Sequence, residues 1–200
     1  MRTAARPTLG ILLSGACLVV TGCGNPCATQ GARVEGALRR AREVRADLYA
    51  PEPLKQAAEA LKQAQDECRL QSSTFFPFRT YRGAQALFDT ALQRSEAAVA
   101  QAGVGKGLAK QEALNSRYEA GMAVNEALLS LRRAREMKGD PTAQAMAGRL
   151  DGLRAALGEL QRRIDAGQYL AARELGGRIR EEAVRLEGEA NHGALSAPRR

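Results

Sequence analysis

The sequence predicts an all-α protein, built as two tandem Ala-rich three-helix units that form an elongated antiparallel helical bundle. Composition is the first reason: the 200 residues contain no Trp and 4% aromatic residues, while Ala, Leu, Arg, Glu and Gln dominate, as they do in helices. Apolar residues also recur at spacings of three and four, which is the period of a helix face. An internal repeat then indicates two copies of one unit.

The repeat consists of two matched segments that occur in the same order in each half of the chain. Leu38–Asp47 recurs as Leu131–Asp140, and each segment is followed by a proline break. Tyr81–Ala102 aligns in the same way with Tyr169–Ala190. Each copy is therefore expected to be one supersecondary unit of three helices.

Periodicity and break signals predict helices at residues 33–49, 53–71, 80–102, 108–138, 142–165 and 168–190. Pro51 and Pro53 separate the first two helices, and Asp140-Pro141 starts the fifth with a capping Asp and a first-turn Pro. The fifth helix carries the clearest heptad seam, which steps by four and three through Met146, Leu150, Leu153, Leu157, Leu160 and Ile164.

These helices divide into a first helical unit at residues 33–102 and a second at 108–190. The Gly-rich segment Gly103–Gly107 between them predicts a flexible joint. It does not fit a phosphate loop, because a helix precedes it and Gly107 stands where that loop needs Ser or Thr. Residues 23–32 predict a flexible arm, and residues 191–200 predict a disordered tail.

Residues 1–22 predict an export signal. Arg2 and Arg6 precede an apolar run, Leu9–Val20, that is too short to span a bilayer. The run leads into Gly22-Cys23, and a small residue followed by cysteine resembles the lipobox of bacterial lipoproteins. In those proteins the cysteine receives a diacylglycerol, the chain is cut before it, and the new amino terminus is acylated, often with palmitate. The resemblance implies lipidation at Cys23 and, since no Asp follows it, an outer-membrane location facing the periplasm.

The signal and the helices together resemble the lipoprotein family known as domain of unknown function 4398. Its members pair a lipobox with Ala-rich helices that are separated by a Tyr-Ala-Pro-Glu-like break and a Gly-Asp-Tyr-like turn. Here Tyr49–Glu52 matches the break and Gly167–Tyr169 matches the turn, whereas the second copy lacks the tyrosine before Asp140-Pro141. The resemblance implies a helical bundle and assigns no activity.

Two cysteines remain for pairing once Cys17 is removed with the signal and Cys23 is lipidated. Cys27 and Cys68 would then lie in an oxidising compartment. If the first two helices form an antiparallel hairpin, the end of the second returns beside the start of the first. We therefore predict a Cys27–Cys68 disulfide. The alternative is that Cys68 is a small buried hydrophobe and Cys27 an unpaired residue of the arm.

The connection after the second helix holds three of the four phenylalanines, Phe75, Phe76 and Phe78, followed by Arg79. In the hairpin topology this loop lies at the end of the bundle that faces the membrane. Exposed Phe beside Arg suits a membrane interface or a docking patch for a partner. Alternatively, the rings cap the open end of a bundle that has few other large side chains.

The sequence contains no enzyme signature that we can identify. Its single histidine, His192, has no cysteine or carboxylate cluster nearby at metal-ligand spacing. The acidic pairs Asp66-Glu67 and Glu181-Glu182 would point about 100° apart on a helix, so they do not converge. We predict no catalytic residue, no metal site and no cofactor.

The net charge is +8 for the whole chain and +6 once Arg2 and Arg6 leave with the signal. The Arg residues are spread along helices beside Glu, which is typical of solvated helix faces, and export argues against a nucleic-acid partner. We therefore expect a lipid-anchored, non-enzymatic envelope lipoprotein that acts as a helical protein-interaction scaffold. Its expected partners are the membrane, through the lipid, and an envelope protein. The alternative is a structural lipoprotein that organises the cell wall or the membrane.

Overall fold

The computed structural model describes residues 26–75, 78–138 and 141–195, and it confirms the all-α class. Six α-helices follow one another along this part of the chain. They are α1 (Pro26–Glu43), α2 (Ala46–Tyr49), α3 (Pro51–Ser73), α4 (Arg82–Lys138), α5 (Pro141–Asp165) and α6 (Tyr169–Leu195).

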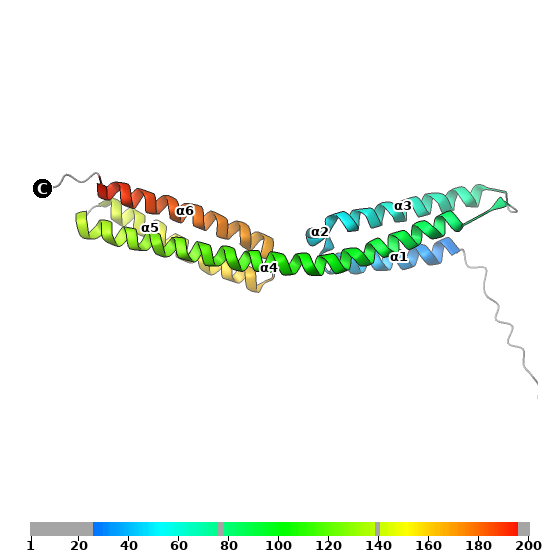
Figure 1. Cartoon of the computed structure of the whole chain (residues 1–200), viewed down its shortest axis with the longest axis horizontal. Coiled ribbons are helices and arrows are strands. Elements are labelled where there is room, and N and C mark those ends of the chain that lie inside the picture. The colour runs from blue at the N-terminus through cyan, green and yellow to red at the C-terminus, as the bar shows by residue number, and fades with distance from the viewer. Residues whose placement is uncertain (1–25, 76–77, 139–140, 196–200) are drawn as a thin grey trace, which may run out of the picture.

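One helix, α4, forms the axis of the molecule (Figure 1). It has 57 residues, which at 1.5 Å per residue gives a length of about 85 Å. Helices α1, α2 and α3 pack against its first half, and α5 and α6 pack against its second half. Within the described residues, no Cα of α1–α3 lies within 8 Å of α5 or α6. The molecule is therefore an elongated rod of two three-helix units that share α4.

The core of the first unit is filled mostly by small side chains. Ala57 and Ala64 of α3 and Ala84 and Ala91 of α4 are completely buried, and Phe88 is the largest of the fully buried residues described. Alanine allows helix backbones to approach closely, but each such contact removes little apolar area from water. The stability of this unit therefore depends on many small contacts around one aromatic ring.

The core of the second unit contains larger aliphatic side chains. Leu150, Leu160 and Ile164 of α5 pack with Ile179 and Leu186 of α6. Buried alanines of α4 complete this cluster, at Ala113, Ala120, Ala123 and Ala127. The heptad seam that the sequence predicts in α5 thus lies in the core, because its a and d positions face α4 and α6.

Burial follows the internal repeat. The first half of α4 corresponds to α6, and residues 88 positions apart are buried in both, as in the pairs Ala84 and Ala172, Ala91 and Ile179, Ser95 and Ala183, Ala98 and Leu186, and Ala102 and Ala190. Leu38 of α1 and Leu131 in the second half of α4 are likewise both buried. The third helix of the first copy therefore continues directly into the first helix of the second.

This continuity shows that the flexible joint predicted at Gly103–Gly107 is wrong. The segment is helical and lies within α4. Each Gly in a helix costs only about 1 kcal/mol relative to Ala, and the long helical stretches on both sides offset that cost. Gly105 also packs closely against α2, since a Cβ built on it would lie 2.6 Å from the carbonyl oxygen of Tyr49.

The predicted arm and tail are each partly wrong. Residues 26–32 of the arm form the first turns of α1, where Gly31 is buried and a Cβ there would lie 3.9 Å from the ring of Phe88. Residues 191–195 of the tail continue α6, because no proline ends the helix before Pro198 and Ala190 is buried just upstream. Residues 23–25 and 196–200 lie outside the described range.

Two left-handed residues mark the tight turns between helices. Arg45, with φ 63°, separates α1 from α2, so the single helix predicted at 33–49 is interrupted. Gly167, with φ 73°, ends α5 as predicted. There the Gly167 N–H donates to the Ile164 carbonyl (3.0 Å) and the Gln168 N–H to the Arg163 carbonyl (2.9 Å), which is the Schellman pattern.

Candidate functional site

A disulfide closes one end of the rod and joins the start of α1 to the last turns of α3. The Cα atoms of Cys27 and Cys68 lie 6.2 Å apart, and the bond links residues separated by 41 positions. This confirms the predicted pairing, and the alternative of an unpaired Cys27 is wrong. The antiparallel arrangement of α1 and α3 explains the pairing, because it returns the end of α3 to the start of α1.

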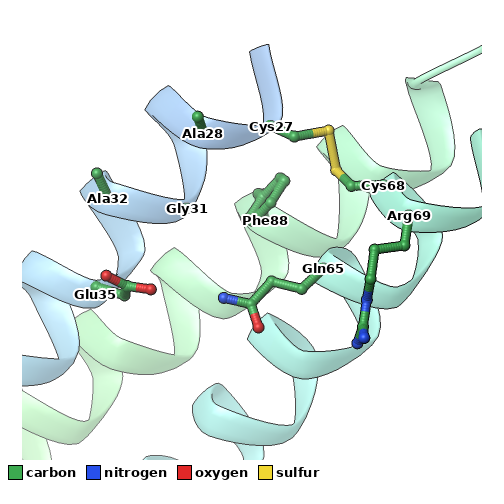
Figure 2. A pocket seen from close by; sticks show the side chains of 9 residues that line it. All are labelled: Cys27, Ala28, Gly31, Ala32, Glu35, Gln65, Cys68, Arg69 and Phe88. Carbon is green, nitrogen blue, oxygen red and sulfur yellow. A yellow bond between two sulfur atoms is a disulfide. The ribbon is translucent and has the colours of Figure 1, made fainter. Parts of the chain in front are cut away.

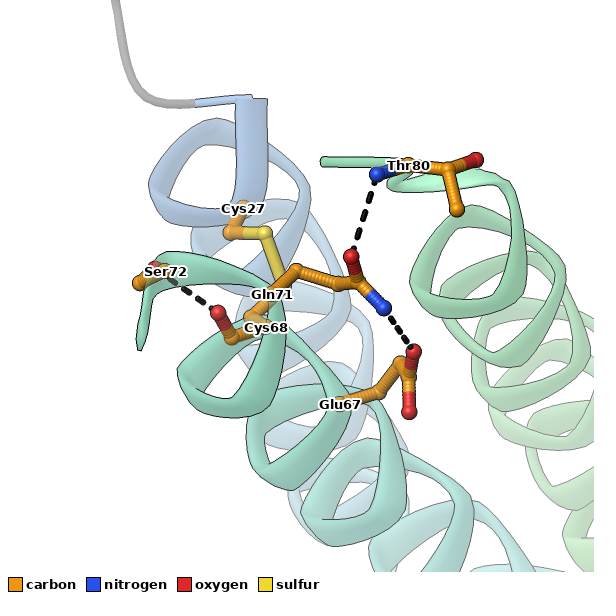
Figure 3. The surroundings of a disulfide bond; sticks show 6 residues. All are labelled: Cys27, Glu67, Cys68, Gln71, Ser72 and Thr80. Carbon is orange, nitrogen blue, oxygen red and sulfur yellow. Dashed lines mark hydrogen bonds between the residues drawn. A yellow bond between two sulfur atoms is a disulfide. The ribbon is translucent and has the colours of Figure 1, made fainter. Parts of the chain in front are cut away.

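Gln71 connects the end of α3 to Thr80, two residues before the start of α4, next to the disulfide. Its amide nitrogen donates a hydrogen bond to the Glu67 carboxylate (2.9 Å), and its amide oxygen accepts one from the Thr80 N–H (3.0 Å) (Figure 3). Ser72 donates to the Cys68 carbonyl oxygen (2.7 Å) in the same turn. These contacts fix both ends of the loop between α3 and α4.

Arg79 closes the same loop from within. Its Nε donates to the carbonyl oxygen of Thr74 (2.8 Å) and its Nη2 to that of Ser72 (3.0 Å). Carbonyl oxygens at a helix C-terminus lack intrahelical partners, and a cation there interacts favourably with the helix dipole. The guanidinium group therefore turns back onto α3.

Two phenylalanine rings project from this loop into solvent. Phe75 and Phe78 are each 74% exposed, and their ring centroids lie 6.4 Å apart. The Phe78 N–H donates to the Phe75 carbonyl oxygen (3.0 Å), so a turn holds the pair together. The capping role is wrong for these two rings, since neither is buried, and Phe76 lies outside the described residues. We call Phe75, Phe78 and Arg79 the aromatic tip.

The aromatic tip presents apolar surface on a braced loop. Leu70 on α3 is also exposed, and Arg69 and Arg82 lie close by in sequence at the ends of the two helices. Aromatic rings beside guanidinium groups match the boundary between lipid headgroups and acyl chains. The same combination suits the centre of a protein interface. Its chemistry is therefore recognition of an apolar surface.

An open groove of about 560 Å³ lies beside the disulfide. Figure 2 shows Phe88 reaching from α4 into the space between α1 and α3, with Glu35, Gln65 and Arg69 around it. This set has one carboxylate and no nucleophile next to a base, so it does not form a catalytic constellation. Across the described ranges, no three His, Cys, Asp or Glu side chains gather in a way that would hold a metal ion.

Ion pairs between helices are the main electrostatic feature of the second unit. Arg149 of α5 bonds to Glu182 (2.7 Å) and Glu189 of α6. Its hydrogen bonds lower the pKa of both carboxyl groups, and the bonds to Glu189 and then Glu182 raise the pKa of Arg149. Side-chain hydrogen bonds from Arg163 and Arg162 likewise lower the pKa of Glu159. The Arg149 pairs join α5 to α6, whereas the Glu159 pairs lie within α5.

The sequence reasoning missed a stripe of exposed apolar residues along α4, from its middle into its second half. Of the twelve large hydrophobic residues that are exposed in the described chain, six lie on this stretch: Val104, Leu108, Leu114, Tyr118, Met122 and Leu129. A groove of about 450 Å³ runs beside Tyr118 and Met122, with Leu157 and Gly158 of α5 on its other side. The heptad spacing was visible in the sequence, but spacing does not reveal which apolar face of α4 is already covered.

No helix in residues 26–75, 78–138 and 141–195 is long and apolar enough to cross a bilayer. No protein-family model, curated protein or solved structure matches this chain. The resemblance to domain of unknown function 4398 therefore stays a prediction. So do the signal at 1–22 and lipidation at Cys23, which lie outside the described residues.

Proposed function

We propose that the protein is a lipid-anchored, non-enzymatic scaffold of the bacterial cell envelope, which presents helix surfaces to a protein partner. The lipobox-like Val20–Cys23 supports the anchor. The observation that carries the proposal is that the disulfide joins the start of α1 to the end of α3. The start of α1 and the α3–α4 loop, which carries the aromatic tip, therefore lie at the same end of the rod (Figure 1). The anchored chain and the exposed rings would therefore meet the same membrane.

Chain length limits how far this end would stand from the lipid. Cys23 is three residues before Pro26, where α1 begins, and an extended chain spans at most about 3.6 Å per residue. The start of α1 would lie within about 11 Å of the modified cysteine. That distance keeps Phe75 and Phe78 within reach of the headgroup region, which favours membrane contact for the aromatic tip.

The far end of the rod would then extend into the periplasm. Charged residues of the second unit bridge helices, as in the pairs Arg173–Glu112 (2.6 Å) and Arg180–Glu119 (2.8 Å). The two grooves described above are open to solvent, and their lining residues do not form a catalytic set. Such grooves favour docking of a partner over catalysis. The rod would act by holding a docking surface at a fixed distance from the membrane.

The aromatic tip also favours one form of the alternative function. A structural lipoprotein that organises the membrane would use Phe75 and Phe78 directly, whereas binding to the cell wall would not need them. The two functions differ in the partner of the distal unit. In-cell crosslinking with mass spectrometry should recover one defined envelope protein if the scaffold proposal is correct. Co-purification with peptidoglycan and no protein would favour the structural alternative.

Palmitate labelling of cells tests the anchor. The wild-type protein should carry the label and sediment with membranes, whereas Cys23→Ala should carry none, because the thiol that accepts the diacylglycerol is missing. Cys17→Ala is the matched control and should label like the wild type. Label retained in Cys23→Ala would contradict the anchor at this residue.

The double variant Phe75→Ser/Phe78→Ser tests the aromatic tip without changing the anchor. In anchored protein, hydrophobic photo-labelling from within the bilayer should reach residues near the tip in the wild type and lose that reaction in the variant. Val104→Ser, on α4 and away from this end, should leave the labelling unchanged. Equal labelling in all three proteins would show that the tip does not enter the membrane.

A further inference from the structure

A groove of about 510 Å³ lies at the middle of the rod, where the first unit meets the second along α4. One wall is formed by Arg45 and by Leu48 and Tyr49 of α2, and the other by the turn between α5 and α6 together with the first residues of α6. Lys106 of α4 also lines it. Figure 1 shows α2 and the start of α6 on either side of this place. We call it the inter-unit groove.

The inter-unit groove carries positive charge, and none of the described residues that line it is acidic. Lys106 has no ion pair within the described chain. Both Lys106 and Arg45 therefore bring a cation to the groove without a carboxylate among its lining residues. Such a groove is complementary to an anionic group.

The start of α6 adds to this positive charge. The backbone N–H groups of Tyr169, Leu170 and Ala171 have no acceptor in the described chain, and the first turn of α6 contains no acidic side chain. All three residues line the groove. The positive end of the helix dipole therefore acts beside the two cationic side chains.

Arg45 has a backbone conformation that does not favour a long side chain. It is the one non-glycine residue with a positive φ, 63°, in the described ranges, and Gly is the residue that normally takes this conformation. Its ion pair with Asp47 (3.5 Å) is exposed on both sides, and such pairs contribute little to stability. The turn does not require a guanidinium group, so a contact of that group with a ligand explains arginine better.

Apolar surface lies next to these charges. Leu48 is 45% exposed. Tyr49 and Tyr169 are half-buried and pack against the cores of the first and the second unit, respectively. A bare phosphate ion would meet the cations and leave these side chains uncovered. A peptide with Asp or Glu next to an apolar residue would match both parts of the groove.

We propose that the inter-unit groove binds an acidic peptide segment of a partner protein. A carboxylate of that segment meets Lys106 and Arg45, and a neighbouring apolar side chain covers Leu48 and the tyrosine rings. The inference rests on the scaffold function, because it names the docking site and the chemistry of the partner. At 1.5 Å per residue Lys106 lies about 36 Å along α4 from Arg82, so a membrane that contacts the aromatic tip does not reach the groove.

Peptide binding to the purified full chain tests the proposal directly. A fluorescent octapeptide of alternating Glu and Leu should bind saturably at low salt, whereas the same peptide with Gln in place of Glu should not. Lys106→Glu should weaken binding of the acidic peptide by about tenfold, because it places like charges together. Lys62→Glu, at an exposed site on α3 outside the groove, is the matched control and should change it less than about twofold.

Arg45→Gly separates binding from folding. Because Gly takes the left-handed conformation readily, the melting temperature should be unchanged or higher, while affinity for the acidic peptide should fall about fivefold. Arg39→Gln removes the same charge from an exposed site on α1 that does not line the groove, and it should leave affinity unchanged. An equal loss in the two variants would mean that net charge alone attracts the peptide, which would overturn the proposal.

A photo-crosslinking residue in place of Leu48 tests the site in cells. It should attach to one envelope protein through a peptide that contains Asp or Glu, and Lys106→Glu should abolish that crosslink. Exchange of the attached acidic residue for Lys in the partner should restore it, because the two charges are then reversed together.

Three results would overturn the proposal. The first is equal affinity of the wild type and Lys106→Glu for the acidic peptide. The second is binding of inorganic phosphate without binding of the peptide, as at a simple anion site. The third is a crosslink from position 48 to lipid, or to a protein segment without Asp or Glu. Failure at the groove, with an envelope protein still recovered elsewhere on the rod, would leave the scaffold function standing. Peptide binding through Lys106 without any protein partner in cells would contradict the scaffold function instead.

Discussion

At the scale of single residues, two glycines of α6 stand side by side in very different surroundings. A Cβ built on Gly176 would lie 2.3 Å from the Ser116 Oγ and 3.1 Å from the Ser116 carbonyl oxygen. A Cβ on Gly177 would meet nothing within 4 Å. Ser116 Oγ also donates to the Arg173 carbonyl (3.1 Å), so the contact at Gly176 sets how closely α6 approaches α4.

Alanine at these two glycines should therefore have opposite effects. Gly177→Ala should stabilise the protein by about 0.5–1 kcal/mol, because Ala loses less conformational freedom than Gly in a helix. Gly176→Ala should destabilise it by about 1–3 kcal/mol, because the added methyl overpacks the contact with Ser116. Urea unfolding followed by circular dichroism measures both. A shift in the same direction for both variants would contradict the close packing.

The ion pairs of Arg149 predict a dependence of stability on pH. The pKa values of Glu182 and Glu189 are lower in the folded protein than in the unfolded chain. Their contribution to stability is therefore present above the ordinary Glu pKa of about 4.3 and is lost as the pH falls through the lower folded pKa values.

Arg149→Gln should consequently lower the melting temperature at pH 7 and have a smaller effect at pH 3. The loss at pH 7 should be at most about 1 kcal/mol, since partly exposed pairs are screened by solvent. Thermal melts of both proteins at the two pH values measure this difference. Arg154→Gln is the control, because Arg154 pairs only with Asp151 on its own helix among the interactions described. An equal loss at pH 3 and pH 7 would argue for a packing role of Arg149.

At the scale of the helices, the sequence predicted those features that depend on residues close together in the chain. The Schellman turn at Gly167 and the heptad seam of α5 were both readable from residue type and spacing. The disulfide was predicted because hairpin topology alone brings Cys68 back to Cys27. The helical state of Gly103–Gly107 was not predicted. Gly forms helices poorly, but it is tolerated here because long helical stretches on both sides and a contact with Tyr49 support the segment.

The candidate site was predicted only in part for the same reason. The sequence placed three phenylalanines and Arg79 in one loop, but it left open whether the rings were buried. That depends on Arg79 and Gln71, whose hydrogen bonds turn the polar groups inward and leave Phe75 and Phe78 outside. The exposed apolar stripe of α4 was missed because burial of one helix face is decided by helices distant in the sequence.

Alanine substitutions at the glycines of α4 test its continuity. Gly103→Ala/Gly107→Ala should stabilise the protein by about 1–2 kcal/mol, because both sites are open and helical. Helical circular dichroism should not increase, since the segment is already helical. Gly105→Ala should destabilise, because its Cβ would lie 2.6 Å from the Tyr49 carbonyl oxygen. A gain of helical signal in the double variant would instead indicate a joint.

At the scale of the whole molecule, two separate cores are connected by one helix. The first unit is closed by the disulfide and the second is not, so the two units should respond differently to its removal. A closed loop of about 40 residues predicts a loss of about 4 kcal/mol when such a bond is removed.

Cys27→Ser/Cys68→Ser should therefore destabilise the first unit by about 4 kcal/mol and leave the second nearly unchanged. Amide hydrogen exchange measured peptide by peptide should show faster exchange in α1 and α3 but not in α5 and α6. Uniform acceleration through both units would show that α4 couples them into one cooperative block.

The unbroken α4 also fixes the angular setting of the distal unit about the rod axis. Each residue of a helix turns the chain by 100° and advances it by 1.5 Å. One residue inserted near Gly103 would swing the distal unit by more than a quarter turn and redirect every surface on it. Seven inserted residues would lengthen the rod by about 10.5 Å with a net rotation of only about 20°. Insertion of whole heptads into α4 would thus change the length of the rod with little rotation, while insertion of a single residue would change the direction in which the distal unit faces.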